Sequence, residues 1–328
     1  EIETSFCETL LEFMIETKKY VSLGTSRAFI GAAKIILTAL FFLYPIYFAF
    51  GSPESNWVKT DFAKFRIISG IKDIGEETKI PLGLEFYLHE GWKIYWRNPG
   101  DAGFPPSFIE NESDNLTDVE WRWPVPIRFT LDGLQSFGYA SHVVIPLTAK
   151  IKSNQHPLNL RTTLNALACR EICIPIEGVL QLQLTTGNGA PSKFSTVLKK
   201  YENLIPTASS WPGFALRSVY LKGKTLTLNI NSPTKLSEPD VFFQTSSDIR
   251  FGKPTVKLSS DQKKAELEIL VEFPDRSIPA EFPASLTFVD NGRFIELNEI
   301  IRPSIVSKNM NAPFWENGSI PITIFLIA

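Results

Sequence analysis

The sequence has few of the residues from which metal sites and disulfide scaffolds are built. Its 328 residues include three cysteines, three histidines and two methionines. Three cysteines cannot staple a small disulfide-rich fold, and so few soft or imidazole side chains leave little material for a metal centre. A basic excess is also lacking, because 33 Lys and Arg face 35 Asp and Glu, for a net charge of -2. This balance argues against a nucleic-acid-binding protein, so we expect no nucleic-acid partner.

Apolar and aromatic residues, in contrast, are plentiful. Hydrophobic residues make up 44% of the chain and aromatic residues 12%, which is enough to bury a core and is atypical of disorder. The length suits about two domains.

The first 51 residues predict an export leader. Basic residues precede an apolar run over residues 35–50, and Ala49 and Gly51 are small residues two positions apart, as a signal peptidase site requires. A spanning helix needs ~20 apolar residues, and Pro45 interrupts this run. We therefore expect a signal peptide over residues 1–51, with an uncleaved N-terminal anchor as the alternative.

The opposite end of the chain is also apolar. Residues 320–328 carry no charge, but nine residues are too few to cross a bilayer. They fit either a last strand or tail, or the start of a transmembrane helix that has been cut off. We expect residues 307–328 to be a tail and the truncated start of a transmembrane segment.

The sequence between the two ends is typical of β-structure. Apolar residues alternate over 62–70, 82–96, 142–151 and 158–168, and turn residues such as Asn98-Pro99-Gly100-Asp101 separate these runs. No helical periods intervene between the runs, so an antiparallel sandwich is favoured over a βαβ sheet.

A short helix and a second β unit follow. Apolar residues in 192–204 recur at helical spacing up to Pro206. Beyond this, Asp290-Asn291-Gly292 is a strong hairpin signal. We expect a cysteine-bearing β domain over residues 52–190, a linker with a short helix over 191–213, and a second β domain over 214–306.

The residues with the most chemical potential are Cys169 and Cys173. Cys7 lies within the expected leader, which leaves this pair as the cysteines of the mature chain. A C-x3-C pair can close a small disulfide loop where the backbone turns between the cysteines. So short a loop gives little chain-entropy stabilisation, so the bond is a poor structural device and a reasonable redox one. Arg170 would favour a thiolate and Glu171 would oppose it.

Three other interpretations of the pair remain open. It is compatible with an inert structural disulfide, with two unreactive buried thiols, or with half of a metal site. The last resembles the motif of Sco-type copper chaperones, with His89, His142 or His156 as a third ligand, but those proteins carry it on a thioredoxin-like βαβ scaffold. Spacing alone favours redox exchange without excluding the others.

Several segments together resemble a known family. They are Gly91 to Gly103 (GWKIYWRNPGDAG), Val119 to Pro124 (VEWRWP), Phe137 to Ala140 (FGYA) with Val144 to Pro146 (VIP), and Cys169 to Pro175 (CREICIP). This combination is similar to the exported N-terminal region of DsbD-type thiol:disulfide interchange proteins, especially the ScsB-like branch. The resemblance is strongest over residues 55–185.

The resemblance implies an all-β chain of two tandem immunoglobulin-like β-sandwich domains, joined by a short helical linker and preceded by a signal peptide. It implies that Cys173 exchanges with partners and that Cys169 is its disulfide mate, although the family spaces these cysteines more widely. An aromatic cap over the disulfide would come from Tyr95, Trp96 or Phe104.

The resemblance also implies partners and a location. A DsbD-type membrane domain would donate electrons, and periplasmic thioredoxin-like or disulfide isomerase-like proteins would receive them. The domain would lie in the periplasm, tethered to the inner membrane in the full-length protein. The expected activity is that of a protein-disulfide reductase without a cofactor or metal. Two rival functions are a non-catalytic binding module with a structural disulfide, and a copper-handling protein that uses Cys169, Cys173 and a histidine.

Overall fold

The computed structural model describes residues 52–131, 133–245, 248–274 and 277–303. The expected signal peptide (1–51) and the expected tail and transmembrane start (307–328) lie outside the described residues. Within the described ranges, no helix is both long and apolar enough to cross a membrane.

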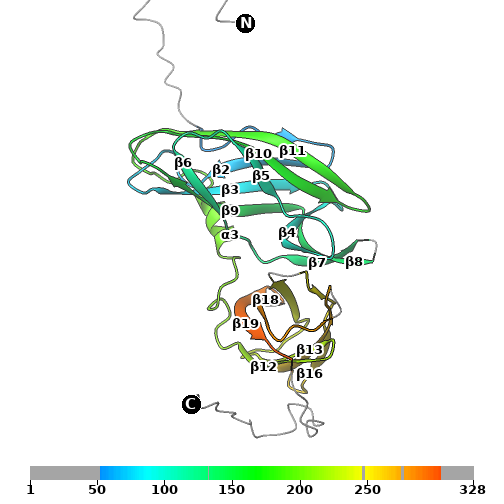
Figure 1. Cartoon of the computed structure of the whole chain (residues 1–328). Coiled ribbons are helices and arrows are strands. Elements are labelled where there is room, and N and C mark those ends of the chain that lie inside the picture. The colour runs from blue at the N-terminus through cyan, green and yellow to red at the C-terminus, as the bar shows by residue number, and fades with distance from the viewer. Residues whose placement is uncertain (1–51, 132, 246–247, 275–276, 304–328) are drawn as a thin grey trace, which may run out of the picture. The chain divides into compact units, whose positions relative to one another are not determined.

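The first β domain is a sandwich of two antiparallel sheets (Figure 1). One sheet consists, in spatial order, of β1 (Val58–Lys59), β2 (Ala63–Ser69), β3 (Lys79–Leu88), β9 (His142–Ile151) and β6 (Leu116–Trp121). The other consists of β11 (Cys173–Leu184), β10 (Leu158–Cys169), β4 (Lys93–Gly100), β8 (Leu134–Ala140) and β7 (Ile127–Leu131), with β5 (Ser107–Asn111) paired to β10.

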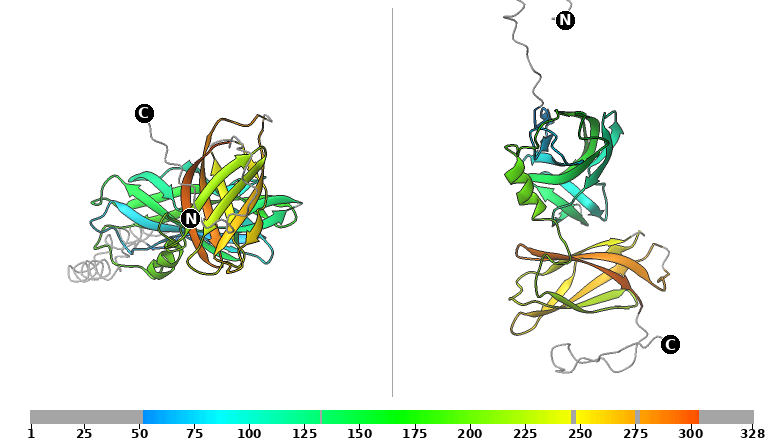
Figure 2. Two further views of the ribbon diagram at one scale, coloured as in Figure 1. Left: turned by 90° about the horizontal axis from the view of Figure 1, so that it is seen from below. Right: turned by 90° about the vertical axis from the view of Figure 1, so that its left-hand side faces the viewer.

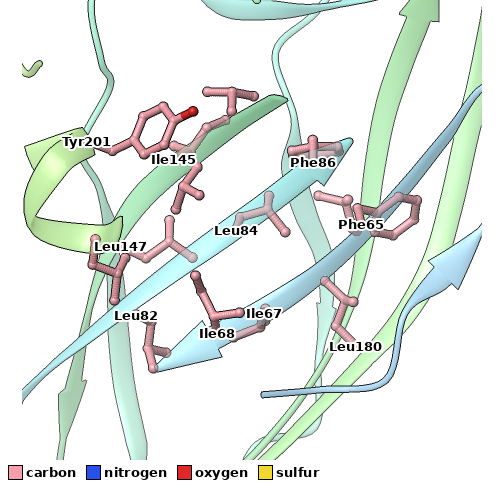
Figure 3. Close-up of a cluster of buried hydrophobic side chains, with 14 of the residues drawn as sticks. Phe65, Ile67, Ile68, Leu82, Leu84, Phe86, Ile145, Leu147, Leu180 and Tyr201 are labelled. Carbon is pink, nitrogen blue, oxygen red and sulfur yellow. The ribbon is translucent and has the colours of Figure 1, made fainter. Parts of the chain in front are cut away.

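The core of this domain follows from the alternation in its strands. Phe65 of β2 pairs with Phe86 of β3, and Ile67 pairs with Leu84, so these four side chains share one face of the sheet. All four are fully buried, and Figure 3 shows them in one hydrophobic cluster that also contains Leu180 of the opposite sheet. Burying each such side chain stabilises the fold by roughly 1.5–3 kcal/mol.

The one helix among the described residues, α3 (Ser195–Glu202), covers the outer face of the first sheet. A Cβ atom at Gly83 of β3 would lie 2.5 Å from Leu198, so the glycine makes room for the helix. Tyr201 donates a 3.0 Å hydrogen bond to the carbonyl of His142 in β9. Figure 2, right view, shows α3 against this domain. The helix lies inside the segment expected as a linker.

The second β domain is another antiparallel sandwich with its own core. One sheet contains, in order, β12 (Ala215–Lys222), β13 (Thr225–Asn231), β17 (Lys264–Glu272) and β15 (Arg250–Phe251), with β16 (Thr255–Leu258) also paired to β17. The other contains β14 (Asp240–Thr245), β18 (Phe282–Asp290) and β19 (Arg293–Ile301).

The predicted turn between β18 and β19 is confirmed. Asn291 and Gly292 both have positive φ, at 46° and 78°, as a two-residue hairpin turn of the mirror-image type requires. Asp290 pairs with Arg293 directly across this turn. The expectation of an all-β chain of two tandem immunoglobulin-like β-sandwiches is likewise confirmed.

Candidate functional site

The two cysteines face each other at the end of a long hairpin. β10 and β11 stay in register from Leu158 opposite Leu184 to Cys169 opposite Cys173. The sulfurs of the last pair form a disulfide across Cα atoms 4.1 Å apart. The amide of Arg170 donates a 3.1 Å hydrogen bond to the carbonyl of Ile172, which closes the turn. The hairpin thus brings the two residues singled out in the sequence together in one bond.

The two sulfurs differ in their access to solvent. Cys169 is 1% exposed, whereas Cys173 is half-buried. Ile172, in the turn directly before Cys173, is 65% exposed. A reagent or protein that approaches the turn therefore reaches Cys173 first.

Tyr95 of β4 connects the disulfide to the interior of the sheet. Its hydroxyl oxygen lies 3.3 Å from Sγ of Cys173 and 3.4 Å from Sγ of Cys169. A disulfide sulfur carries no proton, so the hydroxyl is the donor in either contact. Burial raises the pKa of Tyr95, and the nearby Ser136 hydroxyl opposes that rise only in part. The phenol is therefore protonated at neutral pH and can donate a hydrogen bond to either sulfur.

The ring of Tyr95 packs closely on a glycine and lies near a second aromatic residue. Gly103 has a φ of 101°, and a Cβ atom there would lie 2.3 Å from the ring. The ring of Phe129 in β7 lies 6.1 Å away, between centroids. Gly103 and Phe129 were not singled out as site residues in the sequence, although Gly103 belongs to one of the segments that carry the resemblance.

The three aromatic residues considered as a cap have different environments. Tyr95 alone of the three touches the sulfurs among the contacts of the described residues. Trp96, the next residue of β4, is fully buried on the other face of the strand. Phe104 follows Gly103 and is 37% exposed.

The charges next to the cysteines form a pair with each other. A guanidinium nitrogen of Arg170 lies 3.3 Å from the carboxylate of Glu171, and both side chains are largely exposed. The alkyl stem of Arg170 covers Gly91, where a Cβ atom would lie 2.9 Å from it. Arg170 would favour a thiolate and Glu171 would oppose it. Because the two charges form an exposed pair, they neutralise each other beside the cysteines.

The histidines considered as copper ligands do not form a cluster with the cysteines. Throughout the part of the chain that the structure describes, no three His, Cys, Asp or Glu side chains are grouped so as to hold a metal ion. Nε2 of His142 instead lies 3.0 Å from the carboxylate of Glu85, which Arg66 also contacts at 2.7 Å. The copper-handling alternative finds no support in this arrangement.

Comparison with known proteins gives matches for both β domains. Residues 69–185 match the family model described as thiol:disulfide interchange protein DsbD, N-terminal. Residues 204–304 match a model described as a domain of unknown function, DUF8393. Among curated proteins there is no match.

A solved structure matches most of the chain. The N-terminal periplasmic domain of ScsB from Proteus mirabilis is similar with a TM-score of 0.64 and 23% sequence identity. The match covers 77% of this chain and 100% of that chain. It shows that the two chains share a fold.

Proposed function

We propose that Cys169 and Cys173 are the redox pair of a protein-disulfide reductase, because residues 69–185, which contain both, match the family model of the DsbD N-terminal region. One observation carries the proposal: the half-buried Cys173 sulfur, the buried Cys169 sulfur and the Tyr95 hydroxyl meet within 3.4 Å at the end of a hairpin. A purely structural bond needs neither an accessible sulfur nor a proton donor shared by both sulfurs.

In the reduced protein, the Cys173 thiolate attacks a disulfide of the partner. A bond forms between Cys173 and one partner sulfur, and the other partner sulfur leaves as a thiolate that takes up a proton. The Cys169 thiolate then attacks Cys173, and the first partner sulfur leaves in turn. The partner gains two electrons and two protons, and the Cys169–Cys173 disulfide forms.

Tyr95 acts on the charge that develops in these steps. Its hydroxyl donates toward whichever of the two sulfurs is anionic, because it lies nearly equidistant from both. Such a charge-assisted hydrogen bond is about twice as strong as a neutral one. The burial of Cys169 keeps it available for the second attack and away from competing partners.

The partners and location follow the same proposal. The dithiol of a DsbD-type membrane domain supplies electrons to the disulfide, and periplasmic thioredoxin-like or disulfide isomerase-like proteins receive them. The related ScsB domain is itself periplasmic, which supports the same compartment for this chain. The exposed Ile172 beside Cys173 gives such partners an apolar contact.

Trapping of a mixed disulfide tests this proposal. The full chain with Cys169→Ser or Cys173→Ser is reduced, mixed with an oxidised thioredoxin-like protein, and resolved on non-reducing gels. Cys169→Ser should accumulate a disulfide-linked complex, because Cys173 can attack and nothing resolves the product. Cys173→Ser should accumulate far less, because Cys169 is buried.

Redox titration of the unmodified pair separates the proposal from its main rival. The wild-type chain is equilibrated with dithiothreitol or glutathione buffers and its free thiols are counted by alkylation. Exchange with a potential above about -300 mV is expected, whereas structural disulfides typically lie below that value. A pair that stays oxidised in these buffers would contradict the proposal and favour a binding module with a structural disulfide.

A further inference from the structure

Two strands that line the disulfide site also contact the second β domain. Successive side chains of a strand point to opposite faces. On β4, Tyr95 faces the sulfurs, while Trp96 meets Phe242 of β14 edge-on, with ring centroids 6.0 Å apart. On β7, Phe129 faces Tyr95, while the neighbouring Arg128 faces Phe242 at 5.2 Å. Each strand thus has the disulfide site on one side and the second domain on the other.

Phe242 belongs to the second domain by sequence and to the first by packing. It is 1% exposed and lies in the hydrophobic cluster of the first domain, where its ring meets Phe137 edge-on at 5.0 Å. Its neighbour Phe243 lies in the core of the second domain. β14 is therefore buried on both faces, so the contact between the domains is an apolar one at its centre.

A charged clamp lies beside this apolar contact. Two guanidinium nitrogens of Arg128 each donate a 2.8 Å hydrogen bond to the carboxylate of Asp240, and one also donates to the carbonyl of Val241 at 3.0 Å. The side chains of Arg128 and Asp240 are 10% and 19% exposed. A bidentate ion pair of this kind fixes the relative orientation of the two side chains as well as the distance between them.

A third contact reaches the loop that covers Tyr95. The side-chain amide of Asn98, near the end of β4, donates a hydrogen bond to the carbonyl of Phe243. The Asn98 side-chain oxygen accepts a 3.0 Å hydrogen bond from the amide of Gly100. Gly103, which packs on the Tyr95 ring, follows three residues later. Both the strand and the loop that position Tyr95 are thus attached to the second domain.

We propose that the second β domain is a positioning element for the cysteine pair, with Phe242 and Asp240 holding β4 and β7 so that the Tyr95 hydroxyl stays within reach of both sulfurs. This inference rests on the redox function proposed above, and it assigns a role to the segment matching a domain of unknown function. A hydrogen bond weakens steeply with small displacements. Loosening β4 therefore removes support from the thiolate and moves the equilibrium toward the disulfide.

The test is the equilibrium constant between the full chain and a glutathione buffer at pH 7. Phe242→Ala should move it toward the disulfide by about threefold or more, which is about 14 mV for a two-electron couple. Asp240→Asn keeps the size of the side chain and should move it in the same direction by a smaller factor. Asp240→Asn carries the test alone if Phe242→Ala does not fold.

Two comparisons identify positioning as the cause. Leu228→Ala creates a cavity in the core of the second domain, where Leu228 is fully buried, and should leave the constant unchanged. In a Tyr95→Phe background, Phe242→Ala should add little, because both changes act through the same hydroxyl. The inference would be overturned if the shifts caused by Tyr95→Phe and Phe242→Ala add fully. It would also be overturned if Leu228→Ala shifts the equilibrium constant as much as Phe242→Ala does.

The outcomes also separate this inference from the function beneath it. A wild-type pair that does not exchange with glutathione refutes both. A wild-type pair that exchanges, with Phe242→Ala and Asp240→Asn indistinguishable from it, leaves the redox function standing and refutes the positioning role alone.

Discussion

The hydroxyl of Tyr95 crosses from β4 to lie 3.3 Å from the Cys173 sulfur of β11, with β10 between the two strands in the sheet. The contact is made possible by the register between β10 and β4, which places Cys169 beside Lys93 at the start of β4. It joins the half-buried sulfur of Cys173 to a hydrogen-bond donor that is itself buried.

Tyr95→Phe should destabilise the Cys173 thiolate in the reduced protein. A hydrogen bond to a charged group contributes about 1.5–3 kcal/mol. The thiolate then forms at higher pH, so alkylation at pH 7 slows and its rise with pH moves upward. Tyr139→Phe is the matched control, because the Tyr139 hydroxyl donates to the carbonyl of Pro124 at 2.7 Å. Identical alkylation profiles for wild type and Tyr95→Phe would refute this role.

Gly103→Ala should reproduce the effect of Tyr95→Phe without removing the hydroxyl. The new methyl group would lie 2.3 Å from the Tyr95 ring, so the ring or the loop must move. Gly133→Ala is the control: Gly133 also has positive φ, at 79°, but a Cβ atom there has no neighbour within 4 Å. Backbone strain alone predicts equal effects from the two substitutions. Displacement of Tyr95 predicts that only Gly103→Ala slows alkylation.

Reduction of the disulfide should lower stability only slightly. The bond spans a sequence separation of 4, for which chain entropy gives about 2 kcal/mol. The paired strands of the hairpin remain, so the melting temperature should fall by about 4–8 °C, as expected for a change of this size. Thermal unfolding with and without reductant measures it, and a Cys169→Ser/Cys173→Ser variant should not respond to reductant. Loss of the folded state on reduction would instead indicate a structural bond.

Ile172→Ser should slow exchange with a protein partner but not with dithiothreitol. Ile172 is 65% exposed beside Cys173, so it can contact a protein surface, whereas a small dithiol does not need it. Val179→Ser is the control. Val179 is an apolar residue of β11 that is 47% exposed and lies away from the turn. Equal rates with a thioredoxin-like partner for wild type and Ile172→Ser would show that this contact plays no part.

Glu85→Gln should remove an acid-sensitive part of the stability. Burial by itself would raise the pKa of Glu85, but hydrogen bonds from His142 and Arg66 outweigh it and lower the pKa below 4.5. A carboxyl with a lowered folded pKa stabilises the protein above its unfolded pKa, and this is lost as pH falls through the folded value. Glu85→Gln should thus cost about 1.5–3 kcal/mol at pH 7.

Urea unfolding at pH 7 and at pH 3 measures this contribution. The difference between wild type and Glu85→Gln should narrow at the lower pH. Glu177→Gln, at an exposed carboxylate of β11, should change stability little at either pH. If Glu85→Gln lowers the free energy of unfolding by the same amount at pH 7 and at pH 3, the effect comes from packing rather than from charge.

Strands with regular alternation could be predicted from the sequence, whereas the contacts between elements could not. β9 covers residues 142–151 as the pattern indicates, and the cysteines lie at the turn end of their strands. β14 gave no such signal, because Phe242 and Phe243 are consecutive and both buried, each in a different core. The lack of alternation in β14 is explained by its position between the two domains, where each face of the strand packs in a different core.

Within the site, the cysteines were evident and their surroundings were not. Spacing indicates which residues can form a bond, but the approach of Tyr95 depends on how β4 lies beside β10. Tyr95, Trp96 and Phe104 were equal candidates in the sequence, and the pleat of one strand separates the first two. Gly103 contributes by having no side chain, which leaves room for the Tyr95 ring. No pattern of side chains in the sequence reveals such a role.

Tyr95 and Trp96 point to opposite faces of β4. This limits which part of the protein could be grafted onto another scaffold with its function intact. A designer who grafts this hairpin onto another sandwich would carry over the cysteines but leave behind the second domain that meets Trp96. If that domain positions Tyr95 as proposed, the smallest portable module is both domains together. A first domain separated from the second would then lack the contact between Trp96 and Phe242 that helps to position Tyr95.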